Sequence, residues 1–150
     1  MEKRVFAIPM AEKNRLKQGP APVIFVVDDE PMLLDLAQMI LKAAGFDVRT
    51  YRDPGLALAD YTAAPWRPSL LITDYAMNGM NGMDLLRECR RLRPEQKAIL
   101  VSGTVDESVF AGADIKPDSF VAKPYDPEQF VALVKSLAGD AGKNEKSHDL

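Results

Sequence analysis

The stretch VIFVVDDE at residues 23–30 decides how this chain of 150 residues folds. Its first five residues are apolar without interruption, as a strand covered on both faces of a sheet requires, and three acids follow at once. The sequence predicts four further strands, two from strong apolar runs at residues 70–73 and 98–101 and two from weaker ones at 46–51 and 120–122.

Amphipathic stretches separate these predicted strands. Apolar residues repeat at helical spacing over residues 33–44, and Gly45 follows as a natural C-cap. Residues 83–92 indicate a second helix, and residues 105–111 a short one.

Two further helices are predicted from their first residues. Asp53 precedes Pro54, and Asp126 precedes Pro127 with Gln129 as a capping-box partner. Strands that alternate with helices favour a parallel sheet with right-handed crossovers and helices on both faces. We therefore expect an α/β fold of three layers.

Length and composition favour a single globular domain. The chain is 47% hydrophobic and 27% charged, which is ordinary for a folded protein. A Gly/Pro cluster, QGPAP at 18–22, stops regular structure before the first strand. We expect a leader segment at residues 1–22, the domain at 23–138 and a flexible polar tail at 139–150.

Charge and cysteine content disfavour several classes of protein. A formal charge of -3 offers no global positive field for a nucleic acid. The single cysteine, Cys89, cannot form an internal disulfide, which favours a reducing, cytoplasmic compartment. The chain has no export signal and no apolar run that reaches the roughly 18 residues of a membrane helix. We therefore expect no direct nucleic-acid binding and no membrane span.

Polar groups follow the ends of the predicted strands. Asp28 and Asp29 follow the first strand, Asp74 the third, Ser102 the fourth and Lys123 the fifth. Because the carboxyl ends of parallel strands share one edge, we expect these groups to meet there. Three carboxylates in a cleft repel one another, and a bound cation relieves that repulsion. Since Mg²⁺ prefers oxygen ligands, we expect Asp29 and Asp74 to bind it directly and Asp28 through water.

Each group also has a plain structural explanation. Acids at residues 28–30 suit a helix N-terminus, Ser102 beside Gly103 suits a turn, and Lys123 can be a solvated strand end. The combination at successive strand ends is what favours a functional site, in which Lys123 pairs with a carboxylate or a phosphoryl oxygen.

Four motifs resemble those of the receiver domain of two-component response regulators. They are VVDDE at 26–30, LLITDYAMNGMNG at 70–82, LVSG at 100–103 and FVAKP at 120–124. The resemblance covers most of the predicted domain and implies a doubly wound, flavodoxin-like sheet of five strands in the order 2-1-3-4-5.

The resemblance implies that Asp74 is the phosphoacceptor. The donor is then a phosphohistidine on a sensor histidine kinase or a histidine phosphotransfer protein, because His148, the only histidine here, lies in the tail. Mg²⁺ and Lys123 would offset the charges of the acceptor and the incoming group. The other implied roles are a magnesium site of Asp28, Asp29, Asp74 and the Ala76 carbonyl, phosphoryl contacts at Ser102 and Lys123, an aromatic switch at Phe120 and a cis peptide at Lys123–Pro124.

The chain departs from the family pattern at two places. Asn78 stands where the family usually has proline. The loop after the third predicted strand therefore lacks one backbone φ angle that a proline ring would fix. The pair Gly112 and Ala113 comes earlier than its family counterpart. We therefore expect a shortened fourth helix of about two turns and few packed contacts over residues 103–119.

Other apolar residues leave two interpretations open. Met32, Leu36 and Met39 lie on one side of the first predicted helix. They either dock a partner helix or are residues of the core edge or of the scattered apolar surface. Cys89 lies at helical spacing from Leu85 and is most simply a core residue.

Together these features predict a stand-alone receiver, a monomer or weak dimer, that signals through an unknown protein partner. It would catalyse only its own phosphorylation and dephosphorylation, and its flanks are too short for an output domain. The alternative is an adaptor of the same fold that is never phosphorylated. A phosphatase of the haloacid dehalogenase type is disfavoured, because it needs an acid two residues after the nucleophile, where Ala76 stands.

Overall fold

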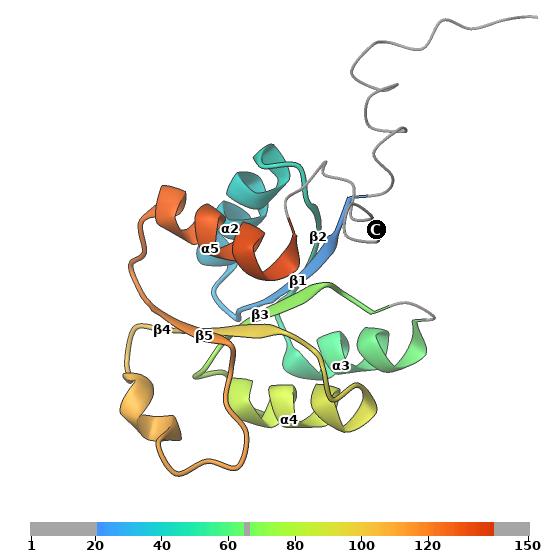
Figure 1. Cartoon of the computed structure of the whole chain (residues 1–150), viewed down its shortest axis with the longest axis vertical. Coiled ribbons are helices and arrows are strands. Elements are labelled where there is room, and N and C mark those ends of the chain that lie inside the picture. Colours follow the sequence, from blue (N-terminus) through green and yellow to red (C-terminus); the bar gives the residue numbers. More distant parts are fainter. Residues whose placement is uncertain (1–20, 65–66, 140–150) are drawn as a thin grey trace, which may run out of the picture.

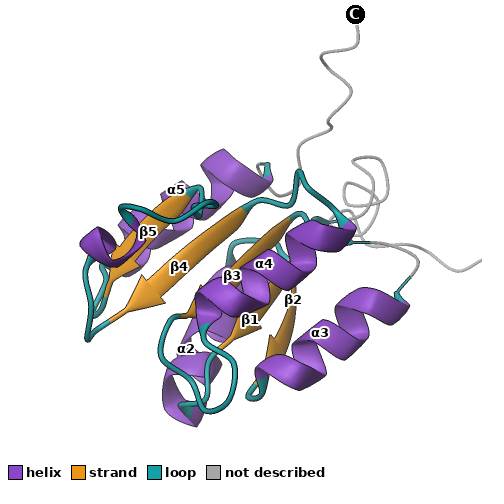
Figure 2. Cartoon of the chain, turned by 90° about the horizontal axis from the view of Figure 1, so that it is seen from below, coloured by secondary structure: helices purple, strands orange, loops and turns teal. Residues whose placement is uncertain are grey.

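A computed structural model describes residues 21–64 and 67–139 of the chain. It contains one sheet with the parallel order β2-β1-β3-β4-β5, which confirms the expected fold (Figure 2). The strands are β1 (Val23–Val27), β2 (Asp47–Tyr51), β3 (Leu70–Asp74), β4 (Ala98–Ser102) and β5 (Ser119–Ala122). The expected leader and tail, with His148, lie almost wholly outside the described residues.

Helices cover both faces of the sheet. They are α2 (Pro31–Ala43), α3 (Pro54–Ala63), α4 (Gly82–Leu92) and α5 (Pro127–Ala138). Figure 1 shows α2 and α5 on one face and α3 and α4 on the other. No helix within the described ranges is long and apolar enough to cross a membrane.

Alternation along each strand builds a core on both faces. In β1, Ile24 and Val26 join the cluster under α2 and α5, whereas Phe25 and Val27 join the cluster under α3 and α4. Cys89 is buried in the second cluster, as its spacing predicts.

The predicted helix boundaries have local causes. The side chains of Asp53 and Asp126 accept hydrogen bonds from backbone N–H groups in the first turns of α3 and α5. Gly45 follows α2 with a φ of 101°, a conformation that favours glycine. The complete reciprocal capping box lies at Asn81 and Asp84, at the start of α4, rather than at Asp126 as the sequence suggested.

The helix in the fourth connection, which is the segment between β4 and β5, is shorter than expected. Instead of two turns over residues 105–111, it forms one 3₁₀ turn, η1 (Glu107–Phe110), capped by Asp106. Phe110 is buried, but Val109 is 46% exposed. A longer helix needs a repeating apolar stripe against the core, and this segment has one buried anchor.

The chain behind η1 is tied to the last turns of α4. Arg90 donates hydrogen bonds from Nη1 to the Lys116 carbonyl (2.7 Å), from Nη2 to Asp118 Oδ2 (3.1 Å) and from Nε to the Gln96 carbonyl (3.0 Å). Asp118 Oδ2 also accepts from the backbone N–H of Ala98 at 2.8 Å. The connection therefore has more contacts than its sequence predicts.

Candidate functional site

Three carboxylates meet at the carboxyl edge of the sheet. Asp28 and Asp29 follow β1, and Asp74 ends the neighbouring strand β3. One oxygen of each lies within 4.8 Å of the others. Asp28 and Asp74 are buried, at 7% and 8% exposure. The sheet order thus brings together the three acids that the sequence proposed as metal ligands.

Lys123 reaches this cluster from the chain after β5. Its Nζ lies 3.0 Å from Asp28 Oδ2, 3.3 Å from Asp74 Oδ1 and 3.5 Å from Glu30 Oε1. Burial acts to lower the pKa of Lys123, but the hydrogen bond that Lys123 donates to Asp28 and the charges of Asp28 and Asp74 outweigh it and raise that pKa. The ammonium therefore stays charged and offsets part of the negative charge of the site.

Asp74 lies in an environment that disfavours its charge. Burial raises the pKa of the Asp74 carboxyl most, the charge of Lys123 opposes that rise, and the charges of Asp28 and Asp29 add to it. One lysine therefore does not fully compensate three acids. A divalent cation among these oxygens would restore the charged carboxylate that a nucleophile needs.

The three acids are unequally free to bind a metal ion. Asp28 uses both its oxygens within the protein, since Oδ1 accepts from the backbone N–H of Glu30 at 3.0 Å and Oδ2 pairs with Lys123. Asp29 and Asp74 line an open pocket of about 390 Å³. This arrangement suits direct contacts of Mg²⁺ with Asp29 and Asp74 and a water-mediated contact with Asp28. The other residues that line the pocket are Glu30, Ala76, Gly103, Thr104 and Lys123.

Ser102 ends β4 beside the cluster. It is buried at 1% exposure, and its Oγ accepts hydrogen bonds from the backbone N–H groups of Thr104 and Val105, both at 3.1 Å. Its Oγ also lies 3.4 Å from Thr104 Oγ1. Because the two N–H bonds use the lone pairs of the Ser102 oxygen, its hydroxyl hydrogen can be donated, either to Thr104 Oγ1 or to another oxygen. The side chain that the sequence proposed as a phosphoryl contact is thus fixed by its own turn.

Phe120 and the Lys123–Pro124 peptide bond lie near the site, on β5 and directly after it. Phe120 is half-buried in β5 and packs with the α3 and α4 face, away from the acidic pocket. The Lys123–Pro124 peptide bond is cis.

Three residues near the site had no assigned role in the sequence. Glu30 contributes a third carboxylate to Lys123, which its place beside Asp29 in the DDE run could have suggested. Gly82 lies so close to β3 that an added Cβ would overlap the Asp74 carbonyl oxygen and lie 2.8 Å from Leu100 Cδ1. Phe110, in η1, contacts the ring of Phe120, in β5, and no local signal in the sequence predicts that contact.

The geometry supports one kind of chemistry best. A buried carboxylate lies beside a fixed ammonium group, a hydroxyl donor and a cluster of oxygen ligands, and it faces a pocket open to solvent. Such a site can place the carboxylate against a phosphoryl group and offset the charge on that group.

Comparison with known proteins identifies the family of the chain from the sequence as a whole. A profile of the response regulator receiver domain matches residues 24–135. The DNA-binding response regulator MtrA of Mycolicibacterium smegmatis is 33% identical over 113 residues, which cover 75% of this chain and 49% of that protein. The probable transcriptional regulatory protein TcrX of Mycobacterium tuberculosis is 30% identical over 129 residues, which cover 85% of this chain and 54% of that protein. The chain spans about half the length of these curated relatives.

Solved structures show the same architecture. The crystal structure of a CheY-like response regulator receiver domain protein from Methanospirillum hungatei superposes with a TM-score of 0.71 at 28% identity, covering 78% of this chain and 93% of the other. The chain therefore belongs to the response regulator receiver domain family of two-component signalling proteins.

Proposed function

We propose that Asp74 accepts a phosphoryl group from a phosphohistidine, in a reaction that requires Mg²⁺. The observation that carries this proposal is the placement of Asp74 Oδ1 3.3 Å from Lys123 Nζ and within 4.8 Å of oxygens of Asp28 and Asp29. The donor is a sensor histidine kinase or a histidine phosphotransfer protein. The phosphorylated form signals by a change in its contacts with another protein.

The transfer forms one bond and breaks one. A carboxylate oxygen of Asp74 bonds to phosphorus as the phosphorus–nitrogen bond to the donor imidazole breaks, and the imidazole keeps the electron pair and takes up a proton. Mg²⁺ held by Asp29 and Asp74 would supply positive charge that offsets the charges of the acceptor and of the incoming phosphoryl group. Lys123 pairs with a phosphoryl oxygen, and Ser102 donates its hydroxyl hydrogen to another.

The same proposal sets the limits of the protein's activity. Its chemistry is restricted to its own phosphorylation and dephosphorylation, so it is a signalling protein rather than an enzyme acting on other substrates. Its output passes through protein contacts without nucleic acid, in keeping with a formal charge of -3. The buried free thiol of Cys89 fits a reducing compartment such as the cytoplasm.

A small phosphodonor tests the reaction without knowledge of the kinase. Acetyl phosphate with Mg²⁺ should add one acid-labile phosphoryl group to the full chain, as measured by intact mass spectrometry. Asp74→Asn should abolish the addition, because it keeps the shape of the side chain and removes the nucleophilic charge. Asp114→Asn is a matched control, since Asp114 is an exposed acid whose partner is Arg87.

Retention of full incorporation in Asp74→Asn would overturn this assignment. Absence of incorporation in the unmodified chain, together with no binding of beryllofluoride and Mg²⁺, would favour the adaptor that is never phosphorylated.

A further inference from the structure

Three aromatic rings connect the residue after Asp74 to β5. The ring centroid of Phe110, in η1, lies 6.2 Å from that of Tyr75 and 5.8 Å from that of Phe120. Phe110 is buried at 5% exposure, whereas Phe120 is half-buried. Phe110 therefore lies against both rings, and a movement of the Phe120 ring past it requires Phe110 to move.

The backbone that leads into η1 is attached to the site. Ser102 Oγ accepts from the N–H groups of Thr104 and Val105, and η1 begins at Glu107. A shift of the Ser102 hydroxyl toward Asp74 pulls on these two amides. The turn that carries Phe110 is therefore mechanically connected to the hydroxyl that contacts the phosphoryl group.

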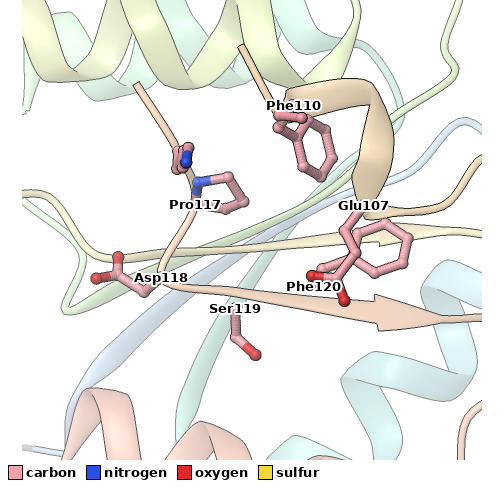
Figure 3. Close-up of a pocket in the computed structure, with 8 residues that line it drawn as sticks. Glu107, Phe110, Pro117, Asp118, Ser119 and Phe120 are labelled. Atoms are coloured by element: carbon pink, nitrogen blue, oxygen red, sulfur yellow. The ribbon is translucent and has the colours of Figure 1, made fainter. Parts of the chain in front are cut away.

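A hollow beside the two phenylalanines offers space for a ring. Its volume is about 210 Å³, and Phe110 and Phe120 border one side of it while Pro117 and Asp118 border the other (Figure 3). A cavity of roughly 150 Å³ is enough to hold benzene in a protein interior. The hollow can therefore accept a phenyl ring from its own wall.

We propose that Phe110 is a positioning residue that holds Phe120 in the place described above and releases it by turning into this hollow. This proposal rests on the proposed function, because the trigger is a phosphoryl group on Asp74. Ser102 moves toward that group, the start of η1 follows, and the Phe110 ring enters the hollow. Phe120 then occupies the space that Phe110 has left.

The proposal determines the sign of a binding effect. If the Phe110 ring opposes the active arrangement, a smaller side chain lowers the free energy of that arrangement and must tighten the binding of any ligand that selects it. Loss of a merely structural contact would instead leave such binding unchanged or weaken it.

Beryllofluoride, a mimic of the phosphoryl group, provides the first test in the full chain with Mg²⁺. Phe110→Leu should bind beryllofluoride about fivefold more tightly than the unmodified chain, the lower end of typical coupling between two sites. Val109→Ala is the matched control, because Val109 lies in the same turn and is 46% exposed, and its affinity should not change. Unchanged or weaker binding by Phe110→Leu would overturn the proposal.

Fluorine NMR of protein labelled with 4-fluorophenylalanine provides the second test. In the unmodified chain, beryllofluoride should shift the signals of both Phe110 and Phe120, as assigned from Phe110→Leu and Phe120→Leu. In Phe110→Leu, the Phe120 signal should move toward its activated position before any beryllofluoride is added. A Phe110 signal that stays fixed while that of Phe120 shifts would contradict the role of Phe110.

Bound beryllofluoride has its own signal in the same spectra. If the signal of bound beryllofluoride is absent from spectra of the unmodified chain, the proposed function of Asp74 is overturned. If that signal is present but the Phe110 signal does not shift, only the positioning role of Phe110 is overturned.

Discussion

Asp28 and Asp29 are adjacent carboxylates with different freedom to bind a metal ion. Both oxygens of Asp28 already have protein partners, whereas Asp29 lines the open pocket. We expect Asp28→Ala to lower Mg²⁺ affinity about tenfold, as loss of an indirect contact does, and Asp29→Ala to lower it further. Isothermal titration of both variants measures the difference, and equal losses would show that the two acids bind alike.

Gly82 restricts the backbone of the proposed phosphoacceptor. A Cβ at this position would overlap the Asp74 carbonyl oxygen, and the main chain cannot yield as a flexible side chain can. We expect Gly82→Ala to lower the free energy of unfolding by about 1–3 kcal/mol, as overpacking does, and to slow phosphorylation of Asp74. Urea denaturation and acetyl phosphate labelling measure the two effects.

Gly112→Ala is the control for this substitution. A Cβ added to Gly112 meets no heavy atom within 4 Å, so the variant should unfold and react like the original chain. Equal behaviour of the two variants would remove the special role of Gly82.

At the scale of the elements, local signals in the sequence predicted most of what the structure contains. Unbroken apolar runs located β1, β3 and β4, and Asp53 and Asp126 located the starts of two helices. Because the strand ends were correct, the acids, Ser102 and Lys123 were placed at one edge of the sheet. The strand order itself came from the family resemblance rather than from periodicity.

The fourth connection was harder to predict because its contacts are distant in sequence. The burial of Phe110 depends on Tyr75 and Phe120, and Arg90 reaches the chain 26 residues later at Lys116. Neither contact leaves a periodic pattern. The sequence therefore indicated a short helix and a weakly held segment where the structure has one 3₁₀ turn fastened to α4.

Arg90 is expected to stabilise this connection. Arg90→Met keeps an apolar stem but removes the hydrogen bonds to Lys116, Asp118 and Gln96. We expect a loss of about 1–3 kcal/mol in the free energy of unfolding and faster hydrogen exchange at residues 111–118. Arg91→Met is the control, because the Arg91 side chain is 67% exposed and pairs only with Glu88 among the described ion pairs. Exchange that is unchanged in Arg90→Met would show that other contacts hold the segment.

At the scale of the whole molecule, an apolar face of α2 lies next to the site. Met32, Met39 and Leu36 are 82%, 62% and 41% exposed, and α2 starts directly after the acids that follow β1. The two methionines therefore do not lie at the edge of the core, and their exposure fits either a docking face or scattered surface residues. A protein donor that packs on this face would bring its phosphohistidine close to Asp74.

This arrangement predicts different effects on two phosphodonors. We expect Met32→Gln combined with Met39→Gln to slow phosphotransfer from the cognate kinase about tenfold, equivalent to about 1.4 kcal/mol of lost docking energy. The rate with acetyl phosphate should stay the same, because that donor needs no docking surface. Leu56→Gln, at a 61% exposed position of α3, controls for a general loss of apolar surface. An equal decrease with both donors would assign the effect to the site itself.

The strand order also determines when each site residue becomes available during synthesis of the chain. Because β1 pairs with both β2 and β3, the sheet can close around Asp28, Asp29 and Asp74 once β3 has emerged from the ribosome. Lys123 follows the last strand and is the final residue of the site to be made. If the sheet closes at this stage, the three carboxylates lie together without their ammonium partner, and dissolved cations then offset that charge until β5 joins the sheet.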